Sequence, residues 1–174
     1  MKKRWVATVY LDTLQIESDP SFKFTCLPKC ARCCIELDIP LRDEDIAKIE
    51  ELDYNAWEFV DYEKMFYRGD KFLGYGLKKR PFDDGCVFLG DDYKCKIYSH
   101  RPLACRLYPF VLIRHGMNLE IYVKEDSFCK GINNPNGESI TGNFIIQYFG
   151  NVIEEYRHKL GISNNHYKPK NLII

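Results

Sequence analysis

Two segments near the N-terminus have the alternating apolar and polar positions of short β-strands. Residues 6–10 and 22–24 are rich in β-branched and aromatic residues, which favour strands. A third alternation covers residues 35–39, and Pro40 would end it because proline cannot donate a hydrogen bond to a strand ladder. The pattern therefore predicts short strands before and after a cysteine-rich segment.

The next stretch changes to the spacing of a helix. Apolar residues recur three apart over residues 46–52, directly after a run of acidic residues, and Asp43 is the predicted N-cap. Asn55 is placed to cap a second short helix that extends through Met65. Two helices are thus predicted between the cysteine-rich segment and the middle of the chain.

The middle of the chain predicts small elements that carry single cysteines. A strand is expected over residues 75–79. Residues 86–89 and 93–95 flank a Gly-Asp-Asp turn, so one cysteine stands on each side of a predicted hairpin. Pro102 begins a helical turn that carries a further cysteine, since proline suits the first position of a helix.

The C-terminal third predicts a strand pair and the longest helix. Residues 111–113 and 119–123 are strands joined by a loop at Gly116. Apolar residues recur on one side of residues 139–160, and Gly161 is a typical stop signal. The residues after Asn164 are expected to be loosely held.

Length and composition suit one domain with a real core. The chain has 174 residues and no repeat, linker or low-complexity segment. We predict a single α+β domain over residues 1–174, built from short strands and hairpins, a cysteine-bearing helical turn and a C-terminal helix. The formal net charge is zero, so no bulk field attracts nucleic acid or an anionic membrane. No apolar stretch reaches the ~20 residues that span a bilayer. We therefore expect binding to neither nucleic acid nor a membrane. A protein partner is left open.

The N-terminus has a basic beginning and a short apolar run that Asp12 ends. No small-residue cleavage site follows, so we interpret the segment as a strand and not as a signal peptide. This interpretation predicts a cytoplasmic protein, and cytoplasmic thiols stay reduced.

Cysteine is the residue type that carries the candidate chemistry. Four of the eight cysteines fall within nine residues, a density that inert buried thiols do not explain. Because disulfides are rare in the cytoplasm, metal ligation is the favoured interpretation, with structural disulfides as the alternative. The predicted metal ligands are Cys26, Cys30, Cys33, Cys34, Cys86, Cys95, Cys105 and Cys129.

The first four cysteines are predicted to surround the start of a helix. If a helix runs from Pro28, then Cys30 shares a face with Cys33 and with Cys34, three and four residues on. Cys33 and Cys34 diverge by about a hundred degrees around the axis. Cys26 would lie over the helix N-terminus, where partial positive charge lowers the pKa of a thiol.

The spacing leaves the metal and the grouping of its ligands open. Zinc and a [4Fe–4S] cluster both accept four thiolates, with a weak preference here for the cluster. Eight thiolates suffice for two sites, divided by halves of the chain or mixed between them. His100 is a weaker ligand candidate. Four basic residues near the cysteines are either counter-charges to an anionic metal site or ordinary solvated side chains: Lys29, Arg32, Arg101 and Arg106.

A longer motif follows in the second half of the chain. Residues 95–110 read C-K-I-Y-S-H-R-P-L-A-C-R-L-Y-P-F, and the first cluster ends in a Cys-Cys pair. Together these resemble the YkgJ-type cysteine-cluster family of zinc- or iron-chelating domains, over about residues 22–132. The sequence departs from the family pattern in its first gap, which has three residues, and at Ala31 and Lys130. The resemblance implies metal chelation.

Two classes of function remain open. One is a metal-binding protein with closed sites, for structure, electron transfer or metal handling. The other is an S-adenosylmethionine-dependent enzyme or an accessory to one. A related domain occurs in flagellin lysine methylases, and Cys26, Cys30 and Cys33 match the C-x3-C-x2-C run of radical enzymes. No Gly-rich nucleotide loop or catalytic triad stands out, so whether the chain is an enzyme is left undecided.

Overall fold

The computed structural model describes residues 2–162 and divides into two compact units. Unit 1 contains the chain up to Cys26 and the chain from Pro109 onward, and unit 2 is Leu27–Tyr108. Helices occur together with antiparallel sheets, so the α+β prediction is confirmed. The single domain over residues 1–174 stays a prediction.

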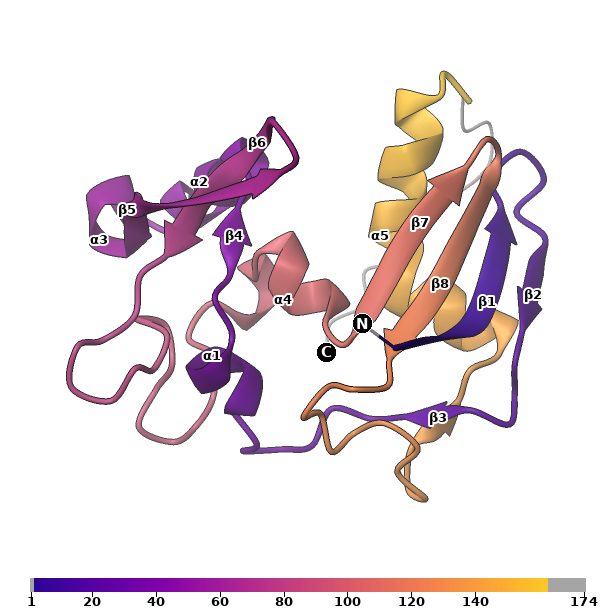
Figure 1. The fold of residues 1–174 in the computed structure, drawn as a ribbon, viewed down its shortest axis with the longest axis horizontal. Helices are drawn as coiled ribbons and strands as arrows, with labels where there is room; N and C mark the ends of the chain where they lie inside the picture. The colour runs from indigo at the N-terminus through magenta and orange to yellow at the C-terminus, as the bar shows by residue number, and fades with distance from the viewer. Residues whose placement is uncertain (1, 163–174) are drawn as a thin grey trace. The chain divides into compact units, whose positions relative to one another are not determined.

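Unit 1 is built on a four-stranded antiparallel sheet with the order β2-β1-β8-β7 (Figure 1). Its strands are β1 (Lys3–Tyr10), β2 (Ile16–Ser18), β7 (Phe110–His115) and β8 (Asn118–Lys124). The β7–β8 turn contains Gly116 at a φ of 60°, a left-handed conformation that favours glycine. The predicted strand pair at Gly116 is therefore confirmed.

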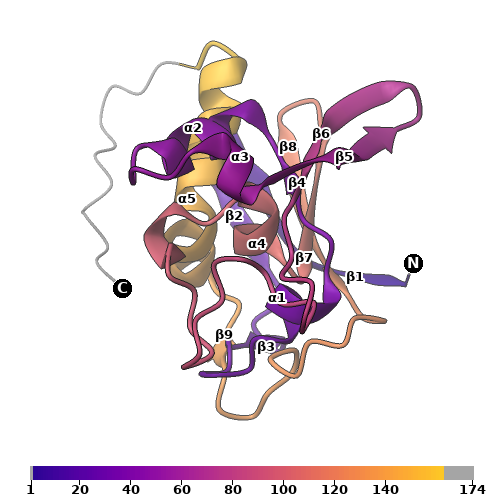
Figure 2. The same cartoon turned by 90° about the vertical axis from the view of Figure 1, so that its left-hand side faces the viewer.

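The helix α5 (Gly142–Lys159) covers one face of this sheet (Figures 1 and 2). It begins where the hydroxyl of Thr141 accepts a hydrogen bond from the Phe144 amide at 3.3 Å. The residues just before it form β9 (Glu138–Ser139), which pairs with β3 (Lys23–Phe24). The predicted C-terminal helix is thus confirmed, with a start three residues later than expected.

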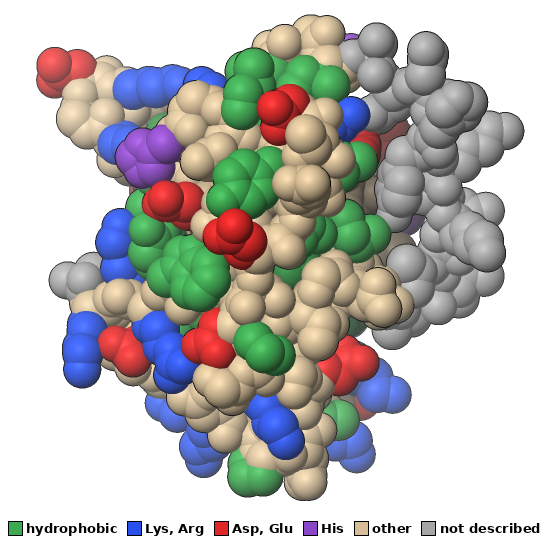
Figure 3. All heavy atoms as spheres, turned by 90° about the vertical axis from the view of Figure 1, so that its right-hand side faces the viewer, with side chains coloured by type: hydrophobic (Ala, Val, Ile, Leu, Met, Phe, Trp, Pro, Cys, Tyr) green, Lys and Arg blue, Asp and Glu red, His purple; other side chains and the backbone are tan. Residues whose placement is uncertain are grey.

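Apolar side chains from both the sheet and α5 form the core of unit 1. Aromatic rings are frequent in it, and Phe110 contacts Phe24 and Phe149 edge to face, with centroids 4.9 and 5.3 Å apart. On the face shown in Figure 3, acidic and basic side chains are interspersed with apolar ones. Fully buried side chains include Val6, Val9, Phe22, Leu119, Ile121, Ile140, Ile145 and Phe149.

Unit 2 contains a smaller antiparallel sheet with the order β4-β6-β5. It consists of β4 (Pro40–Leu41), β5 (Val60–Arg68) and β6 (Lys71–Leu77). The hairpin of β5 and β6 extends away from the other elements of the unit (Figure 2). Gly74 has a φ of 143°, and a side chain there would overlap the Leu41 carbonyl, so this close strand pairing requires glycine.

The helices of unit 2 are short. They are α1 (Arg32–Glu36), α2 (Asp43–Glu50), α3 (Ala56–Phe59), the 3₁₀ turn η1 (Tyr98–His100) and α4 (Leu103–Leu107). They enclose a core that includes one of the cysteines. Its buried members are Ile39, Leu41, Ile49, Phe59, Val60, Leu77, Cys86, Phe88, Leu89 and Ile97.

Three local predictions in unit 2 are wrong. The expected strand over 35–39 does not form, because α1 continues to Glu36 and the strand begins at Pro40. The second helix does not extend through Met65, because it ends at Phe59 and the next nine residues pair with β6 instead. The expected N-cap Asp43 is the first helical residue, and Arg42 is the N-cap.

Two further predictions concern a membrane span and the C-terminal residues. Among residues 2–162, no helix is long and apolar enough to cross a membrane. The expectation for the chain after Asn164 lies outside the described residues.

Candidate metal centre

The structure divides the eight predicted ligands between the two units. Cys26 and Cys129 belong to unit 1, and the other six belong to unit 2. All eight are free thiols, so no disulfide occupies them. The cysteines of unit 2 are Cys30, Cys33, Cys34, Cys86, Cys95 and Cys105.

The first cysteine cluster does not form the helix expected from Pro28. Lys29 and Ala31 have φ values of 57° and 48°, so the chain there makes turns and not a regular helix. The Cys30 amide donates to the Leu27 carbonyl at 3.3 Å within such a turn. Helix α1 begins only after Ala31, and Cys30 therefore does not share a helical face with the later cysteines.

Cys33 and Cys34 lie on α1 and contact each other through their sulfur atoms. The Cys34 thiol hydrogen-bonds to Cys33, which lowers the pKa of Cys33 and raises that of Cys34. The backbone of the same helix also binds a later segment of unit 2, because the Cys86 amide donates a hydrogen bond to the Cys34 carbonyl at 2.8 Å. One hydrogen bond thus joins segments that are 52 positions apart.

Cys86 and Cys95 stand on either side of a tight loop at the predicted Gly-Asp-Asp turn, but the strands expected over 86–89 and 93–95 do not form. Leu89 and Cys95 form an antiparallel bridge, and the Gly90 amide donates to the Lys94 carbonyl at 2.8 Å. Burial raises the pKa of Cys86 to about 11 and also raises that of Cys95. Burial thus favours the neutral form of both thiols.

Cys105 lies on α4, the helical turn predicted after Pro102. Its pKa is raised above the usual range, first by burial and then by the charges that Cys86, Cys33 and Cys95 would carry. Cys34 is affected by Cys86 and Cys105 in the same way. We refer to the five cysteines of unit 2 that influence one another's pKa as the thiol cluster: Cys33, Cys34, Cys86, Cys95 and Cys105.

Two arginines provide positive charge near the thiol cluster. Arg101 lowers the pKa of Cys33 and opposes the burial effect at Cys95, while its guanidinium stacks 3.7 Å from the centre of the Tyr98 ring. Arg80 likewise opposes the effect of burial on the pKa of Cys86. It was not singled out from the sequence, because it follows two lysines in a basic segment. The counter-charge prediction is thus supported at Arg101.

The remaining residues singled out from the sequence have other partners. Arg32 forms an ion pair with Glu36, with its Nε 2.7 Å from the Glu36 Oε1. His100 shares a 2.9 Å hydrogen bond between its Nδ1 and the Ser99 hydroxyl. His100 stays a weaker ligand candidate, as the sequence suggests.

The residue types of the thiol cluster suit a metal, but their present positions do not form a ready coordination site. Among residues 2–162, no three His, Cys, Asp or Glu side chains already stand where they could hold one ion. The donors that gather are nevertheless all sulfur, which suits zinc and iron–sulfur clusters. Ligation would require the thiols to rotate toward a common centre and to lose their protons.

The two cysteines of unit 1 flank a separate backbone pairing. Phe24 and Ile132 form an antiparallel bridge, and the Thr25 amide donates to the Gly131 carbonyl at 3.2 Å. Cys26 follows the first strand of this pairing, and Cys129 precedes the second. The structure thus brings together the chain segments of these two cysteines within unit 1.

Comparison with known proteins agrees with this concentration of thiols. Residues 25–130 match the model of the family described as "CxxCxxCC: Putative zinc- or iron-chelating domain", which covers more than half of the chain. The chain belongs to the CxxCxxCC family. The resemblance drawn from the cysteine motifs is therefore confirmed, and the family supports metal binding.

A curated relative shares this region of the chain. An uncharacterized protein of Methanocaldococcus jannaschii is 35% identical over 108 residues, which are 60% of this chain and 56% of the relative. The chain thus spans little more than half the length of the relative that it matches. No solved structure matches the chain.

Proposed function

We propose that this member of the CxxCxxCC family binds zinc or an iron–sulfur cluster through thiolates of the thiol cluster in unit 2. The observation that carries the proposal is the presence of the five cysteines of the thiol cluster in unit 2, two of whose segments are joined by the hydrogen bond from the Cys86 amide to the Cys34 carbonyl. Their mutual electrostatic effects support this grouping. The ligand set is narrower than the eight cysteines expected from the sequence, and Cys26, Cys30 and Cys129 stay predicted ligands.

Burial disfavours the charged, thiolate form of these cysteines. Raising the pKa of Cys86 to about 11 means that this thiol is neutral at physiological pH in the absence of a cation. A bound cation supplies the missing charge and releases the proton, so metal affinity should rise with pH. Zinc bound there would staple the unit, whereas an iron–sulfur cluster would supply electron transfer.

Cys33 is the thiol best prepared to lose its proton first. Its sulfur accepts the hydrogen bond from the Cys34 thiol, and Arg101 adds positive charge. Because Cys33 and Cys34 are consecutive on α1, their side chains leave the helix about a hundred degrees apart. Five thiols exceed the four ligands of a tetrahedral site, so one member of the cluster is expected to stay outside the first coordination sphere.

Metal analysis of anaerobically purified protein tests this proposal. Iron with acid-labile sulfide and broad visible absorbance would identify an iron–sulfur cluster, and colourless protein with stoichiometric zinc would identify a zinc site. Cys105→Ser should lose this metal. Cys129→Ser, a matched change in unit 1, should leave the metal of the thiol cluster in place. Protein that binds neither metal, or equal loss in both variants, would contradict the proposal.

The S-adenosylmethionine-dependent alternative and the cytoplasmic location rest on the sequence and stay predictions. Calorimetric titration of the metal-loaded protein with S-adenosylmethionine tests the first of these. Binding would favour an enzyme or its accessory, and no heat of binding would favour a closed metal-binding domain.

A further inference from the structure

Asp45 is a buried carboxylate that the proposed metal site does not itself use. It lies in the first turn of α2, and only 1% of its side-chain surface is exposed. Its Oδ2 accepts hydrogen bonds from the Arg42 backbone amide and from the Arg42 Nε, both at 3.1 Å. Burying a carboxylate costs free energy unless it is paired, and Arg42 supplies the opposite charge.

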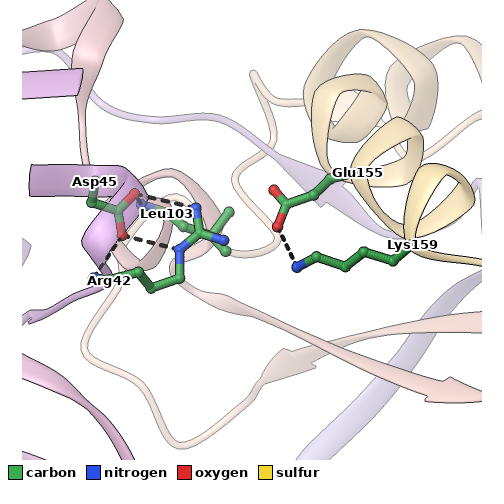
Figure 4. A network of polar contacts seen from close by, with 5 residues as sticks. All are labelled: Arg42, Asp45, Leu103, Glu155 and Lys159. Atoms are coloured by element: carbon green, nitrogen blue, oxygen red, sulfur yellow. Dashed lines mark hydrogen bonds and ion pairs between the residues drawn. The ribbon is translucent and has the colours of Figure 1, made fainter. Parts of the chain in front are cut away.

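The other carboxylate oxygen of Asp45 connects α2 with α4. Asp45 Oδ1 accepts a hydrogen bond from the Leu103 amide at 3.0 Å, across 58 positions of the chain (Figure 4). Leu103 is the first residue of α4, where the backbone amides have no partner within the helix. Pro102, the N-cap of α4, makes no side-chain capping hydrogen bond. A carboxylate from a distant helix therefore caps this one.

This connection matters because α4 is too short to fix its own direction. It has five residues, well below the length at which an isolated helix is stable. Cys105 lies two positions after Leu103, and its environment includes Cys33, Cys86 and Cys95. The direction of α4 therefore decides whether the Cys105 thiol points toward the rest of the thiol cluster.

We propose that Asp45 is a positioning residue for the metal centre, which holds α4 so that Cys105 faces the other thiols. The proposal rests on the metal site inferred above. Asp45 would touch neither the metal nor its ligands, and would act through the Leu103 amide. Its partner Arg42 holds the carboxylate in place through hydrogen bonds from its backbone amide and its Nε.

The first test compares two carboxylates of α2 in the metal-free full chain, titrated with Co²⁺ under anaerobic conditions. Asp45→Ala should raise the dissociation constant for Co²⁺ about tenfold or more, as the loss of other indirect supports of metal sites does. The sulfur-to-cobalt charge-transfer absorbance should fall to the level of Cys105→Ser. Asp43→Ala, an exposed carboxylate in the same turn, should match the unsubstituted protein.

The second test removes the same hydrogen bond from the other side. Leu103→Pro deletes the amide donor, and proline suits the first position of a helix. Pro102 already has a ψ of 150°, which a following proline accepts. Leu103→Ala removes the side chain but keeps the amide. Leu103→Pro should lose charge-transfer absorbance as Asp45→Ala does, and Leu103→Ala should keep it.

A double-mutant cycle separates positioning from general destabilisation. Asp45→Ala should weaken Co²⁺ binding little further when Cys105 is already serine, because both changes remove the same ligand. Equal losses in both backgrounds, or normal charge-transfer absorbance in Asp45→Ala and Leu103→Pro, would overturn the positioning role. If Cys105→Ser itself binds Co²⁺ normally, the proposed ligand set fails, and the role of Asp45 fails with it.

Discussion

The two units reach a stable fold by different means. Unit 1 packs an 18-residue helix against a four-stranded sheet, and its core consists of apolar side chains. Unit 2 has α2, with eight residues, as its longest helix in the described chain, and thiols lie in and against its core. Hydrophobic burial thus dominates unit 1, whereas the metal that we propose for unit 2 would add to the stability of its smaller elements.

In unit 2, two polar contacts anchor the short helix that carries Cys33 and Cys34. The Cys86 amide reaches the Cys34 carbonyl, and the Lys79 ammonium reaches the Ile35 carbonyl at 2.6 Å. Both contacts anchor α1, a five-residue helix without a buried residue of its own. In unit 1, α5 is anchored by apolar side chains such as Phe149, which is fully buried and contacts Phe110.

Removal of the metal should show the largest difference between the units. Structural zinc contributes on the order of 10 kcal/mol to small metal domains, so a chelator should loosen unit 2 and spare unit 1. Hydrogen exchange read by mass spectrometry checks this by comparing the Cys86 region with β1 and β8. Equal loss of protection in both units would show that the metal does not stabilise unit 2 selectively.

The order in which thiols react in the metal-free protein should differ strongly within unit 2. The pKa of Cys33 is lowered to about 7 by the Cys34 hydrogen bond, whereas burial raises that of Cys86 to about 11. Since the thiolate is the nucleophile, iodoacetamide at pH 7 should modify Cys33 well before Cys86. Peptide mapping over time measures the order in which the two cysteines are modified. Raising the pH should bring their modification rates closer together. Faster modification of Cys86 at pH 7 would contradict the assigned environments.

A cavity in the core of unit 1 should affect folding without affecting the metal. Phe149→Ala removes a fully buried ring and should cost about 3–5 kcal/mol of unfolding free energy. Denaturant titration measures the cost, and metal analysis of the folded fraction should give an unchanged stoichiometry. A proportional loss of metal per folded molecule would show that the units are not energetically separate.

The smallest expected effect lies at the start of α5. Thr141→Ala removes the hydroxyl that accepts from the Phe144 amide and should cost about 1 kcal/mol. Thermal melting checks this value, and Thr141→Ser, which keeps the hydroxyl, is the matched control. A serine variant as unstable as the alanine variant would argue against the cap.

Sequence patterns predicted the elements of unit 1 better than those of unit 2. The apolar side of residues 139–160 and the two strands around Gly116 are long, regular signals, and the structure confirms both. The helix expected from Pro28 does not form, because Lys29 and Ala31 adopt left-handed conformations that neither residue type favours. The alternation over 35–39 failed because two residues of it continue α1.

The candidate site was predictable in its chemistry and not in its geometry. Cysteine spacing indicated metal binding and the family, since both depend on residue type and order. The grouping of Cys33 with Cys105, and the bond from Leu103 to Asp45, join residues far apart in the chain. Such contacts depend on tertiary packing, for which a single sequence carries no local signal.

X-ray absorption at the edge of the bound metal tests the central claim most directly. We expect a first shell of sulfur atoms at about 2.3 Å from the metal in the purified protein, with fewer protein sulfurs in Cys105→Ser than in Cys129→Ser. A first shell of nitrogen and oxygen alone, or the same sulfur shell in both variants, would contradict it.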